Sequence, residues 1–97
     1  MRVALFVRNN NMKAIKINAF NVLVLDIEDN TIIGMENDCL YNKNINYVSL
    51  WLINKEVSTI YIEESNEEII KFFEKIDITV KTHKDLEKEP LLRMFQV

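Results

Sequence analysis

The sequence predicts a single α/β domain over residues 1–97, built on a mixed five-stranded sheet flanked by helices. Three observations predict it. An apolar run with strand character opens the chain, a hairpin pattern follows, and helical and strand patterns then alternate to the end. Such alternation is typical of parallel strands joined by right-handed helical crossovers. The expected order is strand, strand, strand, helix, strand, helix, strand, helix, and 97 residues suit one domain.

The first predicted strand covers residues 2–8, "RVALFVR", and is apolar on both faces, which is typical of a central strand. The asparagine-rich residues 9–13 form a polar loop. Residues 14–17 form either a short strand or an extended loop.

A hairpin is predicted over residues 21–37, "NVLVLDIEDNTIIGMEN". Asp29 and Asn30 form its two-residue turn, because both residue types accept a positive φ. Val22, Val24, Asp26 and Glu28 share one face of its first strand, and Leu23, Leu25 and Ile27 share the other. Residues 38–44 are expected to be a connecting loop.

The next segment, residues 46–56, has the apolar spacing of a largely buried helix capped by Asn44 or Asn46. One side carries Tyr47, Leu50 and Trp51, and the apolar stripe is widened by Val48, Leu52 and Ile53. The strand predicted at residues 57–63 alternates Val57, Thr59 and Tyr61 against Ser58, Ile60 and Ile62.

Two capping-box spacings mark the remaining helices. Ser65 and Glu68 begin an amphipathic helix that reaches residue 76, and Thr82 and Asp85 begin a short one after a strand at residues 78–82. Pro90 interrupts the short helix before "LLRMF".

Composition narrows the classes of function. The net charge of −3 gives no general attraction to nucleic acids, and no apolar run is long enough to span a membrane. The single cysteine, Cys39, cannot form an internal disulfide, so a cytoplasmic location is expected. The single glycine, Gly34, excludes a glycine-rich phosphate loop.

The stretches "MRVALFV", "VLVLDIEDNTI", "WLINKEVSTIYI", "FFEKIDITVKT" and "DLEKEPLLRMF" occur here in this order. In this pattern the chain resembles the dinitrogenase iron-molybdenum cofactor biosynthesis family over nearly its whole length. The resemblance implies a ribonuclease H-like fold, and it implies a ligand such as the iron-molybdenum cofactor or an iron–sulfur species. Many family members carry a His-Phe-Gly element before the hairpin and a glycine-rich turn before the first helix. The matching stretches here, "AIKINAFNV" and "NKNIN", contain neither histidine nor glycine, so the residues themselves predict no cofactor.

Asp26 and Glu28 are weak candidates for a metal site, because ribonuclease H-type nucleases hold divalent metals with carboxylates on neighbouring strands. Such a site needs a third carboxylate to converge on them. We therefore interpret both as structural or solvated, and keep a metal-dependent phosphoryl-transfer enzyme as the alternative function. The only histidine, His83, is expected to be exposed in a first helical turn, and Cys39 is expected to be partly buried.

The preferred function is a non-enzymatic binding or accessory module for a small anionic or metal-containing ligand or a protein partner. Its mouth is predicted at residues 9–20, and the candidate ligand-binding residues are Arg8, Asn10, Lys13, Lys16, Asn18 and Phe20. The closing apolar side chains are expected to dock on the same domain, with a structural homodimer as the alternative; they are Leu91, Leu92, Met94 and Phe95.

Overall fold

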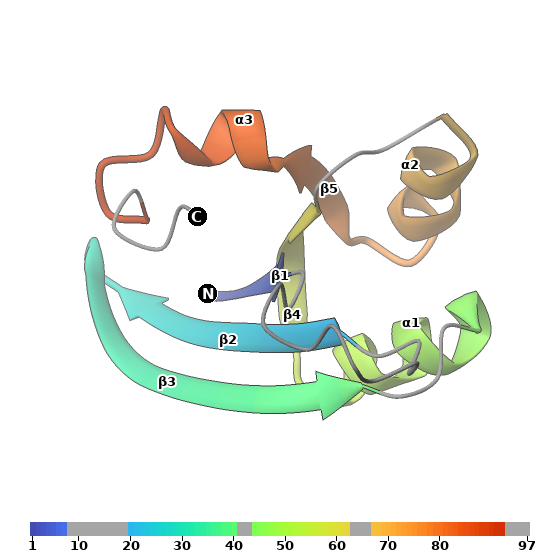
Figure 1. Cartoon of the computed structure of the whole chain (residues 1–97), viewed down its shortest axis with the longest axis horizontal. Coiled ribbons are helices and arrows are strands. Elements are labelled where there is room, and N and C mark those ends of the chain that lie inside the picture. The colour runs from blue at the N-terminus through green and yellow to red at the C-terminus, as the bar shows by residue number, and fades with distance from the viewer. Residues whose placement is uncertain (8–19, 41–43, 63–66, 93–97) are drawn as a thin grey trace, which may run out of the picture.

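The computed structural model describes residues 1–7, 20–40, 44–62 and 67–92. The predicted order of eight elements is confirmed (Figure 1). The strands are β1 (Arg2–Val7), β2 (Phe20–Glu28), β3 (Thr31–Leu40), β4 (Val57–Ile62) and β5 (Thr79–Thr82). The helices are α1 (Ile45–Asn54), α2 (Glu67–Glu74) and α3 (His83–Leu86). No helix in the described ranges is long and apolar enough to cross a membrane.

The five strands form one mixed sheet in the order β3-β2-β1-β4-β5. β1 pairs antiparallel with β2 and parallel with β4; β2 and β3 are antiparallel, and β4 and β5 are parallel. The predicted α/β class is therefore confirmed, with the ribonuclease H-like arrangement in which β2 alone opposes the other four strands. β1 lies in the centre of the sheet, as its apolar character on both faces predicts.

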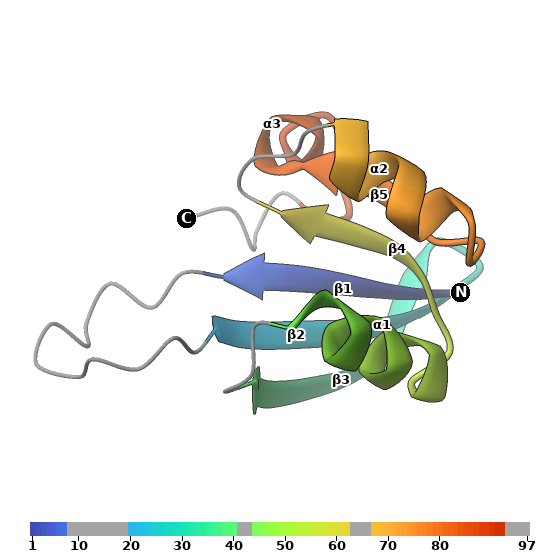
Figure 2. The ribbon, with the colours of Figure 1, turned by 90° about the vertical axis from the view of Figure 1, so that its right-hand side faces the viewer.

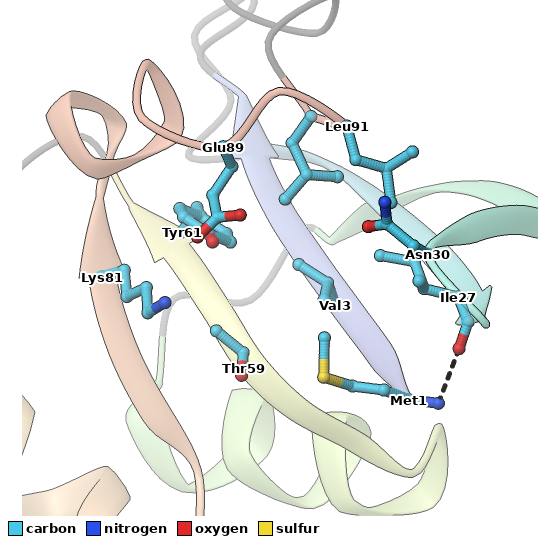
Figure 3. A pocket seen from close by; sticks show the side chains of 10 residues that line it. Met1, Val3, Ile27, Asn30, Thr59, Tyr61, Lys81, Glu89 and Leu91 are labelled. Carbon is cyan, nitrogen blue, oxygen red and sulfur yellow. Dashed lines mark hydrogen bonds between the residues drawn. The ribbon is translucent and has the colours of Figure 1, made fainter.

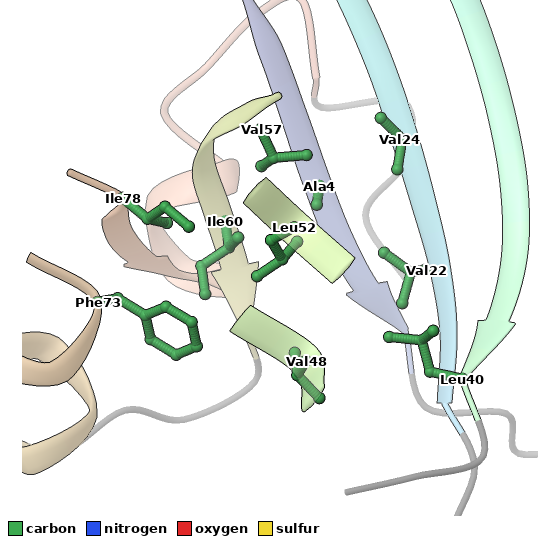
Figure 4. Close-up of a cluster of buried hydrophobic side chains, with 10 residues drawn as sticks. All are labelled: Ala4, Val22, Val24, Leu40, Val48, Leu52, Val57, Ile60, Phe73 and Ile78. Atoms are coloured by element: carbon green, nitrogen blue, oxygen red, sulfur yellow. The ribbon is translucent and has the colours of Figure 1, made fainter. Parts of the chain in front are cut away.

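The two faces of the sheet carry separate cores. α1 and α2 cover one face, and α3 lies on the other together with the chain that follows it (Figures 1 and 2). The helix face buries ten residues: Ala4, Val22, Val24, Leu40, Val48, Leu52, Val57, Ile60, Phe73 and Ile78 (Figure 4). The α3 face buries Val3, Leu5, Leu25, Ile27, Tyr61, Leu86 and Leu92. The predicted alternation along β2 is confirmed, because Val22 and Val24 face the helices while Leu25 and Ile27 face α3.

The hairpin turn is also as predicted. Asp29 and Asn30 both have positive φ, 50° and 60°, as a tight two-residue turn with matching twist requires. β3, however, is longer than expected, since it continues through Leu40 and pairs that residue with Phe20. The prediction of a loop from residue 38 was wrong because the long partner strand extends the ladder beyond what local propensity indicates.

The alternation expected in β4 fails at Val57. Arg2 pairs with Val57 but Val3 pairs with Thr59, so Ser58 is an extra residue at this point. Val57 therefore joins the helix-face core with Ile60, whereas Tyr61 joins the opposite core.

The prediction that α1 is largely buried was wrong for Tyr47, Leu50 and Ile53. The buried residues of α1 are Val48, Ser49 and Leu52, and Trp51 is partly buried against the helix-face core. Tyr47 is 46% exposed, Leu50 67% and Ile53 48%. The helix is apolar around most of its circumference, so its apolar spacing does not identify the face that packs on the sheet.

The helix caps agree with the sequence where they are described. The Asn44 side chain accepts a hydrogen bond of 2.9 Å from the Asn46 backbone N–H, and the Thr82 backbone N–H donates to Asp85 at 2.9 Å. Leu92 is buried on this domain, which confirms that part of the predicted docking of the closing segment. Other predictions lie outside the described residues: the polar loop at residues 9–13, the element at residues 14–17, the cap at Ser65, and the packing of Met94 and Phe95.

Candidate functional site

The predicted ligand-binding residues are not placed by the structure. Arg8, Asn10, Lys13, Lys16 and Asn18 lie outside the described residues, as does the side chain of Phe20. Residues 8–19 connect the end of β1 to the start of β2, and these ends are neighbours because Val7 pairs with Asn21. The predicted mouth at residues 9–20 thus stays a prediction for the end of the sheet where β1 stops and β2 begins.

The surroundings of Asp26 and Glu28, the candidate metal ligands, suit structural or solvated side chains. Asp26 forms an ion pair with Arg2, whose Nε lies 3.8 Å from Asp26 Oδ2, and Glu28 is exposed next to the hairpin turn. Within the described ranges, no group of three histidine, cysteine, aspartate or glutamate residues is placed to hold a metal ion.

A second charged cluster ties α1 to the edge of the sheet. Lys55, at the end of α1, forms a salt bridge with Glu36 and lies 3.7 Å from Asp38 on β3. Hydrogen bonds from Asp38 and Lys55 lower the pKa of Glu36, while the hydrogen bond with Glu36 raises the pKa of Asp38. Arg2 donates a hydrogen bond of 2.9 Å to the Lys55 carbonyl oxygen. This cluster orients α1 on β3, and its cations and carboxylates already bind one another.

A pocket of about 190 Å³ opens on the α3 face of the sheet (Figure 3). It lies between the start of β1, the middle of β4 and the turn after α3. Ten residues line it: Met1, Val3, Ile27, Asn30, Thr59, Tyr61, Lys81, Glu89, Leu91 and Leu92. An apolar floor with a few convergent polar groups is the usual composition of a small-molecule site.

Strand register explains how the polar groups of this pocket meet. Thr59 and Tyr61 are two residues apart on β4, so they point to the same face, and Tyr61 pairs directly with Lys81 on β5. Glu89 reaches the rim from the turn that follows α3 (Figure 3). The polar groups of the lining thus include the Lys81 ammonium, the Glu89 carboxylate, the hydroxyls of Thr59 and Tyr61 and the Asn30 amide. The N-terminal ammonium of Met1 also lies there and donates a hydrogen bond of 2.9 Å to the Ile27 carbonyl oxygen.

The surroundings of the Tyr61 hydroxyl favour its neutral form. Burial raises the Tyr61 pKa, and the negative charges of Glu89 and Asp85 raise it further. The Lys81 Nζ lies 5.9 Å from the centre of the Tyr61 ring, a cation–π distance that keeps the ammonium beside the pocket. Tyr61 therefore offers a hydrogen-bond donor, and Lys81 offers a positive charge, to a bound molecule.

The sequence reasoning missed this pocket. The alternation along residues 57–63 already placed Thr59 and Tyr61 on one face, which was the available signal. Lys81 and Glu89 join them only through the parallel pairing of β5 and the return of the chain after α3.

Two further expectations were wrong. His83 is half-buried rather than exposed, and its Nε2 donates a hydrogen bond of 3.0 Å to the Phe6 carbonyl oxygen. The ring links α3 to the end of β1. Cys39 is exposed rather than partly buried, because it lies on the edge strand β3.

Comparison with known proteins establishes the fold alone. No protein-family model matches the chain, and no curated protein is similar to it in sequence. The crystal structure of PH0822 is similar, with a TM-score of 0.68 over 98% of this chain and 88% of that chain. Sequence identity is 14%, so the likeness supports the α/β architecture and transfers no activity.

Proposed function

We propose that this protein is a small, non-catalytic binding module, an outlying relative of the dinitrogenase iron-molybdenum cofactor biosynthesis family. Its ligand is a small organic acid that also carries an amino or hydroxyl group. The supporting observation is the pocket on the α3 face, where Lys81, Tyr61 and Glu89 surround an apolar floor.

The arrangement of charges supports this ligand class. Lys81 attracts a carboxylate, and Glu89 on the rim favours an ammonium or hydroxyl donor. The buried side chains of Val3, Ile27 and Leu92 accept a short apolar body. The volume of about 190 Å³ is below the range of roughly 300–1,000 Å³ that is usual for drug-sized ligands, so the ligand is small.

A metal-containing ligand would bind at a different site from the pocket. We assign such a ligand to the predicted mouth at residues 9–20, where Lys13 and Lys16 supply positive charge. Native mass spectrometry of the full chain purified from its own host tests this. A metal-containing adduct that is lost in the Lys13→Ala, Lys16→Ala double variant and kept in Lys81→Met assigns that ligand to the mouth.

The pocket itself is tested by isothermal titration calorimetry with L-leucine and two matched probes. Leucinamide lacks the carboxylate, and isocaproate lacks the amine. We expect L-leucine to bind more tightly than either probe, because only it satisfies both Lys81 and Glu89.

Variants make this test specific to the pocket. Lys81→Met keeps the alkyl stem and removes the charge, so L-leucine binding should weaken at least tenfold, whereas Lys84→Met on the exposed side of α3 should change nothing. If all three probes bind equally, or if Lys81→Met binds as the native chain does, the pocket is not the ligand site.

A further inference from the structure

The pocket on the α3 face contains a buried hydroxyl group that the fold leaves without a partner. Tyr61 is only 3% exposed, and its side chain lines the pocket (Figure 3). Its hydroxyl forms no hydrogen bond with any residue that the structure describes. Buried polar groups in native proteins are nearly always hydrogen-bonded, so an unpaired one requires an explanation.

Other polar side chains of similar position in the fold are paired. Ser49, which is 7% exposed, donates a hydrogen bond of 2.9 Å to the Asn46 carbonyl oxygen. The half-buried His83 bonds to the Phe6 carbonyl oxygen at 3.0 Å. Neither of these side chains lines the pocket, whereas Tyr61 does. The unpaired hydroxyl therefore coincides with the place where a ligand would lie.

The two charged groups of the pocket are also unengaged. Neither the Lys81 ammonium nor the Glu89 carboxylate forms a salt bridge or a side-chain hydrogen bond with a described residue. At the end of α1, by contrast, Lys55 forms a salt bridge with Glu36. The pocket thus keeps a hydroxyl, a cation and a carboxylate available at one place.

The position of the Tyr61 ring is fixed by its neighbours. Tyr61 pairs with Leu5 on β1 and with Lys81 on β5, so it lies within the sheet rather than at its edge. Its side chain belongs to the apolar core that also contains Leu86 and Leu92. A side chain that is already held by the core loses little conformational freedom when a ligand binds. Its hydrogen bond is therefore available at low entropic cost.

The charges around the hydroxyl indicate which ligand atom it binds. Burial and the negative charges of Glu89 and Asp85 raise the Tyr61 pKa, so the hydroxyl keeps its proton and is a donor. Lys81 is its direct neighbour on β5, with Nζ 5.9 Å from the centre of the Tyr61 ring. A carboxylate has two oxygens, and a hydroxyl and an ammonium that lie side by side can each bind one of them.

We infer, on the basis of the proposed function of this pocket, that Tyr61 and Lys81 together bind the carboxylate of the ligand. Lys81 supplies the charge, and the Tyr61 hydroxyl donates a hydrogen bond to the second oxygen. Figure 3 shows Tyr61 between Lys81 and Glu89. The acid is therefore oriented with its carboxylate toward β5 and its amino or hydroxyl group toward the turn after α3. Tyr61 is a specificity-determining residue for acids.

Thermal unfolding gives the first test, and it needs no ligand. An unpaired buried hydroxyl costs stability in the free protein. Tyr61→Phe removes the hydroxyl and keeps the ring in the core, so this variant should melt at or above the native temperature. Loss of stability in exchange for binding is common at functional sites. A variant that melts several degrees below the native chain would assign the hydroxyl to the structure and overturn the inference.

Isothermal titration calorimetry of the full chain gives the second test, with three probes. L-Leucine carries both groups, isocaproate carries only the carboxylate, and 3-methylbutylamine carries only the amine. Tyr61→Phe should weaken the binding of L-leucine and isocaproate about tenfold, because a hydrogen bond to a charged group is lost. The binding of 3-methylbutylamine should not change.

Tyr47→Phe is the matched control. It removes the same hydroxyl from α1, where Tyr47 is 46% exposed and lies outside the pocket. This variant should change neither the melting temperature nor the binding of any probe. A loss of L-leucine binding in Tyr47→Phe equal to that in Tyr61→Phe would contradict a specific role of the pocket hydroxyl.

A double-mutant cycle tests whether Tyr61 and Lys81 bind the same group. If both contact one carboxylate, the Lys81→Met, Tyr61→Phe double variant should lose less affinity for L-leucine than the product of the two single losses. Independent losses would overturn the shared carboxylate. So would an equal weakening of L-leucine and 3-methylbutylamine by Tyr61→Phe, because the hydroxyl would then contact another part of the ligand.

The outcomes distinguish the role of Tyr61 from the proposed function itself. If Lys81→Met weakens L-leucine binding and Tyr61→Phe does not, the pocket is the ligand site and only the role of Tyr61 is wrong. If the native chain binds none of the three probes, the proposed function fails, and the role of Tyr61 fails with it.

Discussion

The two faces of the sheet are covered in different ways. A ten-residue and an eight-residue helix cover one face, whereas the four-residue α3 and the chain through Leu92 cover the other. The helix face encloses the larger core, and the α3 face leaves a pocket between its strands and the turn at Glu89. The helix face thus buries more side chains, and the larger, candidate pocket lies on the other face.

Two leucines, one buried on each face, test the difference between the faces most directly. Leu52→Ala on the helix face removes a side chain with no exposed surface and should lower the free energy of unfolding by about 3 kcal/mol. Leu92→Ala on the α3 face should cost less, about 2 kcal/mol, because Leu92 lines the pocket and water enters the space that is left. Urea unfolding of both variants measures the difference.

Leu50→Ala is the control on α1, since this side chain is 67% exposed and its loss should change monomer stability by at most about 0.5 kcal/mol. If Leu52→Ala and Leu92→Ala lowered the free energy of unfolding by the same amount, the two faces would be equally well packed.

On the α3 face, the start of helix α3 is stabilised by the carboxylate of Asp85. The backbone N–H of Thr82, which hydrogen-bonds to Asp85, lowers the pKa of that carboxyl below its usual value. A lowered folded-state pKa gives stability that is present above the ordinary aspartate pKa and is lost as the pH falls through the folded value. Asp85→Asn should therefore cost about 0.5–1 kcal/mol at neutral pH.

The pH profile separates this role from a simple packing defect. The Asp85→Asn variant should lose part of the acid dependence of native stability, so that the two proteins converge at low pH. If the stabilities of the two proteins instead changed in parallel with pH, the charge of Asp85 would contribute nothing to the stability of the α3 face.

The smallest effect is expected at the end of α1, on the helix face. Glu56 has a φ of 58°, a left-handed conformation that is unfavourable for side chains other than glycine. Glu56→Gly should stabilise the protein by about 0.3–0.5 kcal/mol, after the greater backbone entropy of glycine in the unfolded chain is subtracted. Thermal unfolding measures this. Glu56→Ala keeps a Cβ at the same φ and should give no such gain; an equal gain would attribute the effect to the lost charge.

The sequence by itself determined the elements whose signals are local. The two-residue alternation separates Val22 and Val24 from Leu25 and Ile27, and the pair Asp29-Asn30 specifies the hairpin turn. The apolar run at the start of the chain predicts the central strand β1, and the spacing of Thr82 and Asp85 predicts the start of α3. In each case a residue and its immediate neighbours contain the information.

The tertiary structure decided what depends on distant pairing. The buried side of α1, the length of β3 and the face of Val57 follow from strands that lie far away in the sequence. The candidate pocket is the same kind of feature. Alternation placed Thr59 and Tyr61 together, but only the pairing of β5 with β4 and the return of the chain at Glu89 bring a cation and a carboxylate to them. Side-chain periodicity is local, whereas register and chain return are set by packing across the whole sheet.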